Sequence, residues 1–383
     1  MHLAFLTSEY PHERVTHAAG IGTSIKNLVV ALSKMGVKVT VVVYGQNENI
    51  ILEENGVSIH LIKHQKYKMM GWYWHRKYLQ SYLNHLILAE KIDAIEVPDW
   101  TGITAFMKLK APLVIRFHGS DTYFCHLEQR KQKRKNYWFE KLAVNKAVAY
   151  IAPTTYAGKV SKELFHIKGK PIQTIHYGLA LENFENENPT QFSRGTILYI
   201  GTIIRKKGVF ELPSIVQQVQ QQQPEARVLL IGADAPDVQT NNKSTWELLQ
   251  KEFESKGCQN VHYLGKIPYH QVQQQIKEAH VCVFPSYGET LGMVTIESMA
   301  LRKSVVNTSI GWAQELIEEG ISGFLVHPSD HNAFSEKIIT ILENDALAAT
   351  MGEQGRKRVE TIFDIKKIAQ QNLVFYQSIL AKS

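Results

Sequence analysis

Several common features are scarce in this sequence, and each shortage narrows the class of protein. Its 383 residues include three cysteines, Cys125, Cys258 and Cys282, which are odd in number and lack metal-type spacing. Such usage favours a reducing compartment over a disulfide framework. No apolar run approaches the roughly 18–20 residues of a membrane span. The N-terminus has no basic segment and no small-residue cleavage site, so we expect no signal peptide and a cytoplasmic protein.

The composition is otherwise that of an ordinary globular protein. Hydrophobic residues make up 44% and charged residues 21% of the chain. At about 100–200 residues per domain, this length predicts two domains. The net charge is +7 and the pI about 9.0, which suits a surface that meets phosphates, nucleic acid or an anionic membrane. Charge alone does not separate these partners.

Short apolar runs alternate with longer amphipathic stretches, a pattern typical of βαβ units. In the first half we predict strands at residues 3–6, 38–43, 57–62, 94–97, 113–117 and 150–152, with a helix over 21–35. In the second half we predict strands at residues 196–200, 227–231, 261–264, 281–284, 304–306 and 323–326. The two series indicate two Rossmann-like α/β domains, over residues 1–180 and 190–364. The polar stretch within 178–194 predicts the boundary.

Ligands of open α/β sheets bind outside the carboxyl ends of the strands, so the informative loops follow strands. Gly20 and Gly22 precede the first helix, where glycine lets backbone approach a ligand and the helix start attracts phosphate. A plain tight turn explains a lone Gly-x-Gly equally well. His118 follows the strand at 113–117, where it can donate to a hydroxyl or phosphate, or can instead order the loop.

Two loops of the second half carry charged residues. Residues 201–208 read Gly-Thr-Ile-Ile-Arg-Lys-Lys-Gly and place three cations where a diphosphate could bind, although many charge runs are merely solvated. Residues 285–297 lead from a strand into a helix, whose first N–H groups can hold phosphate. Glu289 lies in that loop and Glu297 in the helix, where carboxylates can accept hydrogen bonds from sugar or ribose hydroxyls.

This combination resembles the retaining glycosyltransferases of family 4, whose fold is called GT-B. Residues 285–297 look like their E-x7-E signature, and residues 311–317 and 320–326 look like the segments that follow it. The resemblance covers nearly the whole chain and is looser over 45–95 and 121–148. It implies two Rossmann-like domains facing across a cleft. The first would bind the acceptor and the second a nucleoside-diphosphate sugar, and the final helix, over 365–383, would cross back to the first domain.

The resemblance also implies roles for individual residues. Glu297 would hold the ribose, Glu289 the donor sugar, and Lys207 with Arg205 the departing diphosphate. The predicted catalytic residues are His118, Arg205, Lys207 and Glu289. The predicted donor-binding residues are Gly20, Gly22, Thr202, Ile267, Leu291, Gly292, Met293 and Glu297. Two positions depart from the family: Thr202 stands where an arginine is common, so Arg205 would take over part of its task, and Ala19 stands where a second glycine is common.

The implied reaction is transfer of a hexose from UDP-glucose or a similar donor to a saccharide or a lipid-linked saccharide, in polysaccharide biosynthesis. Protein cations would replace a metal ion, and the chain contains no Asp-x-Asp motif. We therefore expect no metal, no other cofactor and no nucleic-acid partner. Retention would come from a same-face attack, with the leaving phosphate taking the acceptor proton. The base, the sugar, the acceptor and the oligomeric state are left open.

Two first-half segments, residues 63–78 and 130–139, are both basic and aromatic. Such a mixture can dock on anionic lipid headgroups, which would make the protein peripheral to the inner face of the plasma membrane. It can equally line an acceptor site, where aromatic rings stack on sugars. Solvated helices with buried aromatics are a third interpretation.

Three other functions compete with glycosyl transfer. A dinucleotide-dependent dehydrogenase needs a third glycine, but Ile25 stands at that position of the motif that begins at Gly20. A sugar-nucleotide epimerase or a phosphorylase shares the fold but not the full setting of Glu289 and Glu297. A non-catalytic nucleotide-sugar-binding protein is disfavoured by the presence of Lys207, Glu289 and Glu297 together.

Overall fold

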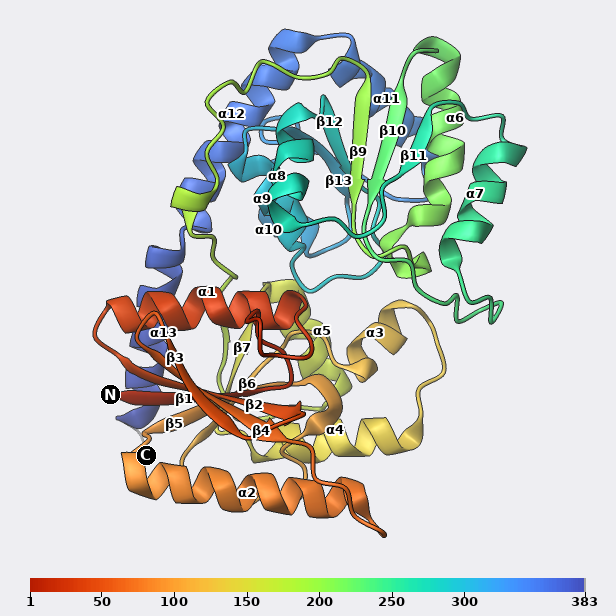
Figure 1. The fold of residues 1–383 in the computed structure, drawn as a ribbon. Coiled ribbons are helices and arrows are strands. Elements are labelled where there is room, and N and C mark those ends of the chain that lie inside the picture. Colours follow the sequence, from red (N-terminus) through yellow and green to blue (C-terminus); the bar gives the residue numbers. More distant parts are fainter. Residues whose placement is uncertain (382–383) are drawn as a thin grey trace. The chain divides into compact units, whose positions relative to one another are not determined.

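The computed structural model describes residues 1–381, which fold into two compact units (Figure 1). Unit 1 contains Met1–Ala180 together with the segment that begins at Phe363. Unit 2 contains Leu181–Ile362. Each unit is an α/β layer structure built on a largely parallel sheet, which confirms the predicted pair of Rossmann-like domains.

Unit 1 is an eight-stranded sheet with the order β3-β4-β2-β1-β5-β6-β7-β8. Its strands are β1 His2–Thr7, β2 Lys38–Gln46, β3 Ile50–Glu54, β4 Val57–Lys63, β5 Ala94–Pro98, β6 Leu113–Arg116, β7 Ala149–Ala152 and β8 Ile172–Thr174. Its helices are α1 Gly20–Lys34, α2 Gly71–Glu90, α3 Asp121–Leu127, α4 Arg134–Lys146, α5 Thr155–Leu164 and α13 Ile365–Leu380, with a 3-10 turn at Trp100–Gly102.

Both faces of this sheet are covered, because buried runs such as Val39–Val43 point apolar side chains to each side. One core contains side chains of β1, β2 and β4 packed against α1 and α13. The other lies between the opposite face and helices α2 and α4. Continuous apolar strands thus become the buried centre of a three-layer unit, and polar residues are left for the strand ends.

The edge of the unit 1 sheet corrects the sequence prediction, which contained neither β3 nor β8. β3 pairs antiparallel with β4 through a two-residue turn at Asn55-Gly56. Both turn residues have positive φ, 54° and 74°, as a type I′ hairpin requires. Asn-Gly is a strong hairpin signal, so the sequence did carry this information. The strand β3 itself was not predicted, because it ends in two charged residues and none of its residues is fully buried.

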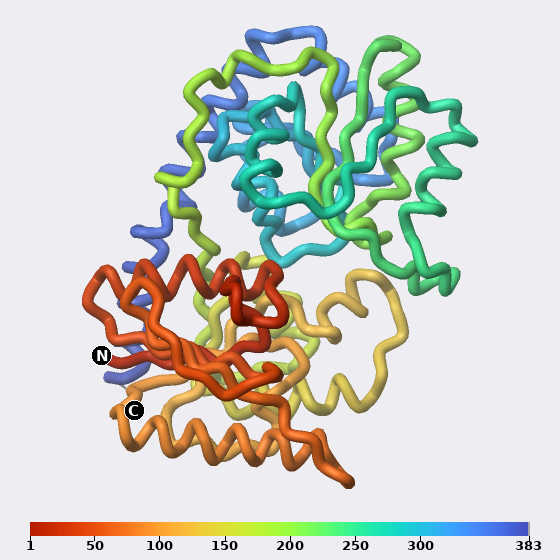
Figure 2. The backbone as a smooth tube through the Cα atoms, viewed as in Figure 1, coloured from red at the N-terminus to blue at the C-terminus, as the bar shows by residue number. Residues whose placement is uncertain are grey.

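The last helix, α13, completes unit 1 rather than unit 2. Figure 2 traces the chain back from unit 2, so that the blue C-terminal segment lies beside the red N-terminal elements. Its Asn372 and Tyr376 reach a buried ion pair between Glu96 of β5 and Arg116 of β6. Arg116 donates to the Asn372 Oδ1 atom at 2.5 Å, and the Tyr376 hydroxyl donates to Glu96 at 2.5 Å. Both charges are therefore hydrogen bonded by α13.

Unit 2 is a six-stranded parallel sheet with the order β11-β10-β9-β12-β13-β14. Its strands are β9 Thr196–Ile200, β10 Arg227–Ile231, β11 Val261–Tyr263, β12 Val281–Phe284, β13 Ser304–Thr308 and β14 Phe324–Val326. Its α-helices are α6 Leu212–Gln222, α7 Thr245–Ser255, α8 Tyr269–Glu278, α9 Met293–Ala300, α10 Ala313–Leu316, α11 His331–Leu342 and α12 Asp345–Ile362. Its 3-10 turns are Leu181–Asn183, Arg205–Lys207 and Val209–Glu211.

The strand order of unit 2 reverses direction between β9 and β12. From β9 the chain moves outward to β10 and β11, then returns to place β12 on the other side of β9. The crevice at such a reversal is where doubly wound sheets bind ligands. The loops after β9 and β12 are therefore the first place to seek a site.

Among residues 1–381, no helix is both long and apolar enough to cross a bilayer.

Candidate functional site

The loops after β9 and β12 bring two predicted site residues into contact. Lys207 follows β9 in the 3-10 turn Arg205–Lys207, and Glu289 follows β12. The Lys207 ammonium forms an ion pair with the Glu289 carboxylate. Both side chains are partly exposed, so a ligand can reach the pair. The pair thus lies at the reversal point of the sheet, where an anionic ligand would meet the lysine.

Backbone contacts lock these two loops together. The carbonyl of Lys206 accepts hydrogen bonds from the N–H groups of Tyr287 at 2.8 Å and Gly288 at 3.2 Å. Gly208, at φ 69°, lies so close to Pro285 that an added Cβ would fall 1.8 Å from its carbonyl oxygen. Only glycine fits there, for both reasons. The ion pair is therefore held by backbone geometry on both sides, as a preorganised site requires.

Arg205 is arranged differently from Lys207. It makes two hydrogen bonds to Asp237, at 2.7 and 3.0 Å, and its guanidinium lies 4.3 Å from the centre of the Phe210 ring. The Arg205 guanidinium holds the pKa of Asp237 well below its usual range. Much of its charge is thus already balanced within the protein. Thr202, the other predicted residue of this loop, is exposed.

The start of α9 offers backbone N–H groups rather than a capping side chain. Gly292 occupies the cap position in a left-handed conformation, φ 99°, and gives no side-chain hydrogen bond. Leu291 is buried and anchors the loop, whereas Gly292 and Met293 are partly accessible. The first turn of α9 thus contains no acidic residue and has no side-chain cap, an arrangement that suits phosphate binding.

Glu297 lies one turn further into α9 and is buried. Burial raises the pKa of its carboxyl group to about 7, while a hydrogen bond from the Tyr269 hydroxyl opposes that rise. Tyr269 is the first residue of α8 and follows Ile267, which is half-buried in the loop after β11. A carboxylate has lone pairs for several hydrogen bonds, so Glu297 can accept from the hydroxyls of a diol such as ribose besides Tyr269.

In unit 1, the predicted residue His118 is a buried, neutral hydrogen-bonding group. Its Nδ1 atom lies 2.7 Å from the Tyr177 hydroxyl, and the two rings stack at 5.2 Å. Its Nε2 atom has no hydrogen-bond partner among the described residues. Burial, reinforced by the Arg116 charge, lowers the pKa of His118 well below its usual value. His118 lines a cavity of about 10 Å³, room for roughly one water.

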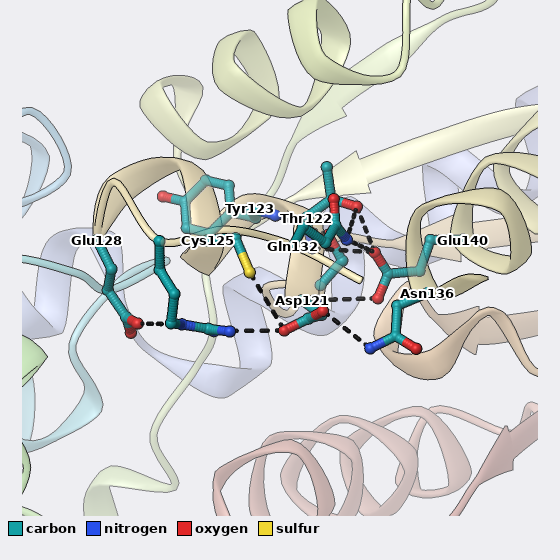
Figure 3. A network of polar contacts seen from close by, with 10 residues as sticks. Asp121, Thr122, Tyr123, Cys125, Glu128, Gln132, Asn136 and Glu140 are labelled. Carbon is teal, nitrogen blue, oxygen red and sulfur yellow. Dashed lines mark hydrogen bonds and ion pairs between the residues drawn. The ribbon is translucent and has the colours of Figure 1, made fainter. Parts of the chain in front are cut away.

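Two buried carboxylates hold the loop that carries His118. Asp99, after β5, accepts the backbone N–H groups of His118 and Ser120, each at 2.9 Å. Burial raises the pKa of Asp99 to about 8, with the Glu140 charge adding to the rise. Glu140 of α4 accepts the N–H groups of Asp121 and Thr122 at the start of α3 (Figure 3). Asp99 thus holds the backbone up to Ser120, and Glu140 holds the backbone after it. Together they fix the loop that carries His118.

Gly20 and Gly22 differ in their surroundings and lie in the first turn of α1 rather than in a preceding loop, because α1 already begins at Gly20. Gly20 has open space around it. Gly22 packs on the chain before it: an added Cβ would lie 2.9 Å from the carbonyl carbon of Glu9. Its N–H donates to the Glu9 carboxylate at 3.3 Å. Gly20 is thus open to a ligand, while Gly22 secures the helix start.

Several residues of the site were not predicted. Asp237, Tyr269, Asp99 and Tyr177 each contact a predicted residue, and Glu140 holds the segment that follows His118; none lies in the motif of its partner. Asp99 carried a usable signal, since it directly follows β5, and Tyr269 carried a weaker one, since it ends the loop after β11. Glu140 and Tyr177 gave none, because their roles depend on which helices and loops meet in space.

Comparison with known families gives two matches that together span most of the chain. The model described as Glycosyltransferase Family 4 matches residues 18–183. The model described as Glycosyl transferases group 1 matches residues 182–358. The border between the two matches, at 182 and 183, agrees with the border between the two units.

Curated relatives are similar at modest identity. An uncharacterised glycosyltransferase of Methanocaldococcus jannaschii is 25% identical over 348 residues, which are 89% of this chain and 90% of the relative. The capsular polysaccharide biosynthesis glycosyltransferase CapM of Staphylococcus aureus is 26% identical over 225 residues, 58% of this chain and 53% of the relative. The chain thus spans about half the length of CapM.

Solved structures share the fold over the whole chain. A sucrose-phosphate synthase from Thermosynechococcus elongatus has a TM-score of 0.84 and 21% identity, with all of both chains covered. HepE of Anabaena, solved with UDP and glucose, has a TM-score of 0.71 and 18% identity, covering 99% of this chain and 100% of HepE. S. aureus TarM, solved with UDP and sugar ligands, has a TM-score of 0.74 and 14% identity, covering 98% and 100%.

Proposed function

Since the chain belongs to glycosyltransferase family 4 and has the GT-B fold, we propose that it transfers a hexose from UDP-glucose or a similar UDP-sugar to a hydroxyl of a saccharide or lipid-linked saccharide. The reaction retains the configuration of the anomeric carbon and needs no metal ion. The observation that carries the proposal is the Lys207–Glu289 pair beside the open N-terminus of α9, at the reversal point of the unit 2 sheet.

The proposed donor contacts follow from the charges around that point. The diphosphate lies between the Lys207 ammonium and the N–H groups at Gly292 and Met293, which together oppose its negative charge. Glu289 accepts hydrogen bonds from the hexose hydroxyls and keeps Lys207 in place before the donor arrives. Glu297 accepts the ribose hydroxyls, and Ile267 lies beside the base. Arg205 acts at longer range, because Asp237 already balances it.

The chemical step breaks the bond between the anomeric carbon and the diphosphate oxygen and forms one to the acceptor oxygen. Negative charge grows on the departing UDP, where Lys207 and the α9 N–H groups stabilise it without reorganisation. The acceptor hydroxyl attacks from the same face, and its proton passes to the leaving phosphate oxygen. His118 remains a proposed contact of the donor sugar, and its lowered pKa means that it would act there as a neutral hydrogen-bonding group and not as a cation.

Two kinds of similarity support the choice of donor and acceptor. HepE and TarM were solved with UDP, and both share this fold. CapM acts in capsular polysaccharide biosynthesis according to its name. We therefore propose a role in assembling a surface or exported polysaccharide. The three free cysteines suit a cytoplasmic enzyme, working at the inner face of the membrane where a lipid-linked acceptor is presented.

The first test is UDP release from a panel of UDP-sugars with saccharide acceptors, with and without EDTA. We expect release with one UDP-hexose, unchanged by EDTA, and an α-linked product by NMR when the donor is α-linked. Release that stops in EDTA and returns with Mg²⁺ would refute metal independence. Conversion of the UDP-sugar into its epimer without release would identify an epimerase. Tight UDP-sugar binding without turnover, over all acceptors, would identify a binding protein.

A further inference from the structure

The excess positive charge of the chain comes from two short segments. Residues 63–78 and 130–139 together contain ten Lys and Arg and no Asp or Glu. The remaining 357 residues contain 33 Lys and Arg against 36 Asp and Glu. The net charge of +7 is therefore a local property of 26 residues and not a general basicity. Such segregation indicates a surface for one anionic partner.

The fold joins the two segments into one surface. The first runs from the end of β4 into α2, and the second runs from the α3–α4 loop into α4. The Trp72 ring of α2 lies 4.9 Å from the Phe139 ring of α4. The Lys135 ammonium lies 5.5 Å from the centre of each of these rings. We call the exposed side chains of residues 63–78 and 130–139 the basic-aromatic surface.

This surface exposes both apolar tips and cations without counter-ions. Met69 is 78% exposed, Trp138 59% and Trp74 50%, although such side chains are usually buried. Seven exposed cations of this surface form no ion pair with any residue of 1–381: Lys63, Lys66, Lys68, Lys131, Lys133, Arg134 and Lys135. The third interpretation, solvated helices with buried aromatics, fits only part of these segments: Tyr78 and Tyr137 pack against the core, whereas Trp74 and Trp138 are exposed.

The basic loop before α4 is held in a fixed conformation (Figure 3). Arg130 pairs with Asp121 and Glu128, Gln132 donates to Thr122 at 2.7 Å, and Asn136 donates to Asp121 at 3.0 Å. Between these tied positions, Lys131, Lys133, Arg134 and Lys135 remain exposed. A surface ordered in advance loses little conformational entropy when it binds.

We propose that the basic-aromatic surface docks on an anionic lipid bilayer. The lysines contact the phosphate headgroups, while Trp74, Trp138 and Met69 enter the interface between headgroups and acyl chains, which Trp favours. A soluble polyanion could pair with the lysines, but it would offer no apolar environment to the side chain of Met69. The proposal deepens the proposed function, since a lipid-linked acceptor lies in such a bilayer, but docking can be measured without any transfer reaction.

The test is co-sedimentation of the full chain with phosphatidylcholine vesicles, with or without phosphatidylglycerol. Each lysine near an anionic surface is worth about fivefold in partitioning. We expect wild type to bind only the anionic vesicles. The quadruple variant Lys66→Glu, Lys68→Glu, Lys131→Glu and Lys133→Glu should bind about 600-fold more weakly or worse. A matched control makes the same charge change at exposed lysines elsewhere, and should keep most of the binding: Lys159→Glu, Lys168→Glu, Lys243→Glu and Lys251→Glu.

A second variant separates bilayer docking from plain polyanion binding. Trp74→Ala with Trp138→Ala removes the apolar tips and keeps every cation. It should weaken vesicle binding about tenfold while leaving binding to heparin unchanged. Equal vesicle binding by wild type and the quadruple variant would overturn the proposal, and so would equal vesicle binding by wild type and the tryptophan variant. UDP release from a soluble acceptor, measured without vesicles, tests the proposed function separately and should be normal in all these variants.

Discussion

The Lys207 ammonium is paired with the carboxylate of Glu289, which lies 82 positions later in the chain but in the loop after the neighbouring strand of the sheet. Each side chain therefore limits the positions that the other can take before any donor arrives. Lys207 orients the Glu289 carboxylate, and Glu289 holds the lysine ammonium in place. A donor that binds here must share this pair, which links sugar recognition with phosphate neutralisation.

We predict that this link is visible in a double-mutant cycle. Lys207→Ala should lower kcat by about 10²–10³, because it removes charge stabilisation that develops in the transition state. Glu289→Ala should also lower mainly kcat, and the double variant should lose less than the product of the two single losses. UDP release under saturating donor measures all three. Independent, multiplicative effects would show that the pair does not act as a unit.

Glu297→Ala should behave differently, by weakening donor binding with a smaller change in kcat. Its carboxylate is assigned to the ribose, a part of the donor that does not react. Isothermal titration with UDP should show a loss of about tenfold or more, whereas Glu289→Ala should leave UDP affinity within about threefold. Wild-type UDP affinity in Glu297→Ala would remove Glu297 from the donor site.

The raised pKa of Glu297 also predicts a pH-dependent stability. Its pKa is about 7 in the folded protein and near 4.5 when unfolded, so the folded state binds the proton more tightly. The free energy of unfolding therefore falls as the pH rises from about 4.5 to about 7, by up to about 3 kcal/mol. Glu297→Gln has no proton to lose. The melting temperature of Glu297→Gln minus that of wild type should increase as the pH is raised from about 5 to about 8. A difference that does not change with pH would contradict the assignment.

Asp99 is predicted to be a positioning residue for His118. Asp99→Ala removes the acceptor of two backbone N–H groups, so the His118 loop should move and kcat should fall about tenfold or more. Asp99→Asn keeps one acceptor oxygen and should recover part of the rate. UDP affinity should stay normal in both, since the proposed nucleotide contacts belong to unit 2. A fall in UDP affinity equal to the fall in kcat would indicate general damage instead.

The buried Glu96–Arg116 pair predicts a strong dependence of unit 1 on α13. Arg116→Met should cost about 3–5 kcal/mol in the free energy of unfolding, because Glu96 keeps a buried charge without its partner. Tyr376→Phe removes one hydrogen bond to Glu96 and should cost about 1 kcal/mol. Urea unfolding followed by circular dichroism measures both. As a control, Lys366→Ala removes a side chain of α13 that is exposed and should be nearly neutral.

Much of the fold could be predicted from the sequence, because buried parallel strands are short continuous apolar runs. Residues 196–200, 227–231 and 281–284 were predicted with the bounds that the structure has. β8, with the sequence Ile-Gln-Thr, was missed because a strand of three residues is too short to show a period. Strand order could not be read from these runs, and the placement of β12 beside β9 follows only from the folded sheet.

The sequence motifs of the site could be predicted, but the ion pairs between their side chains could not. Loop position and residue type sufficed to select Lys207, Glu289 and Glu297. They did not reveal that Arg205 is balanced by Asp237 and Lys207 by Glu289, because both partners approach from other strands. A cation in a sequence is only a candidate; whether its charge is available to a ligand depends on which carboxylates the sheet brings to it.

The return of α13 to unit 1 has a consequence for how the protein is made. Unit 2 is a continuous segment, Leu181–Ile362, and can fold as soon as it has left the ribosome. Unit 1 is begun first but finished last, since Glu96 and Arg116 must wait for Asn372 and Tyr376. During synthesis, one face of the unit 1 sheet therefore stays partly uncovered, exposed to chaperones and to aggregation, for as long as more than 180 residues take to be translated.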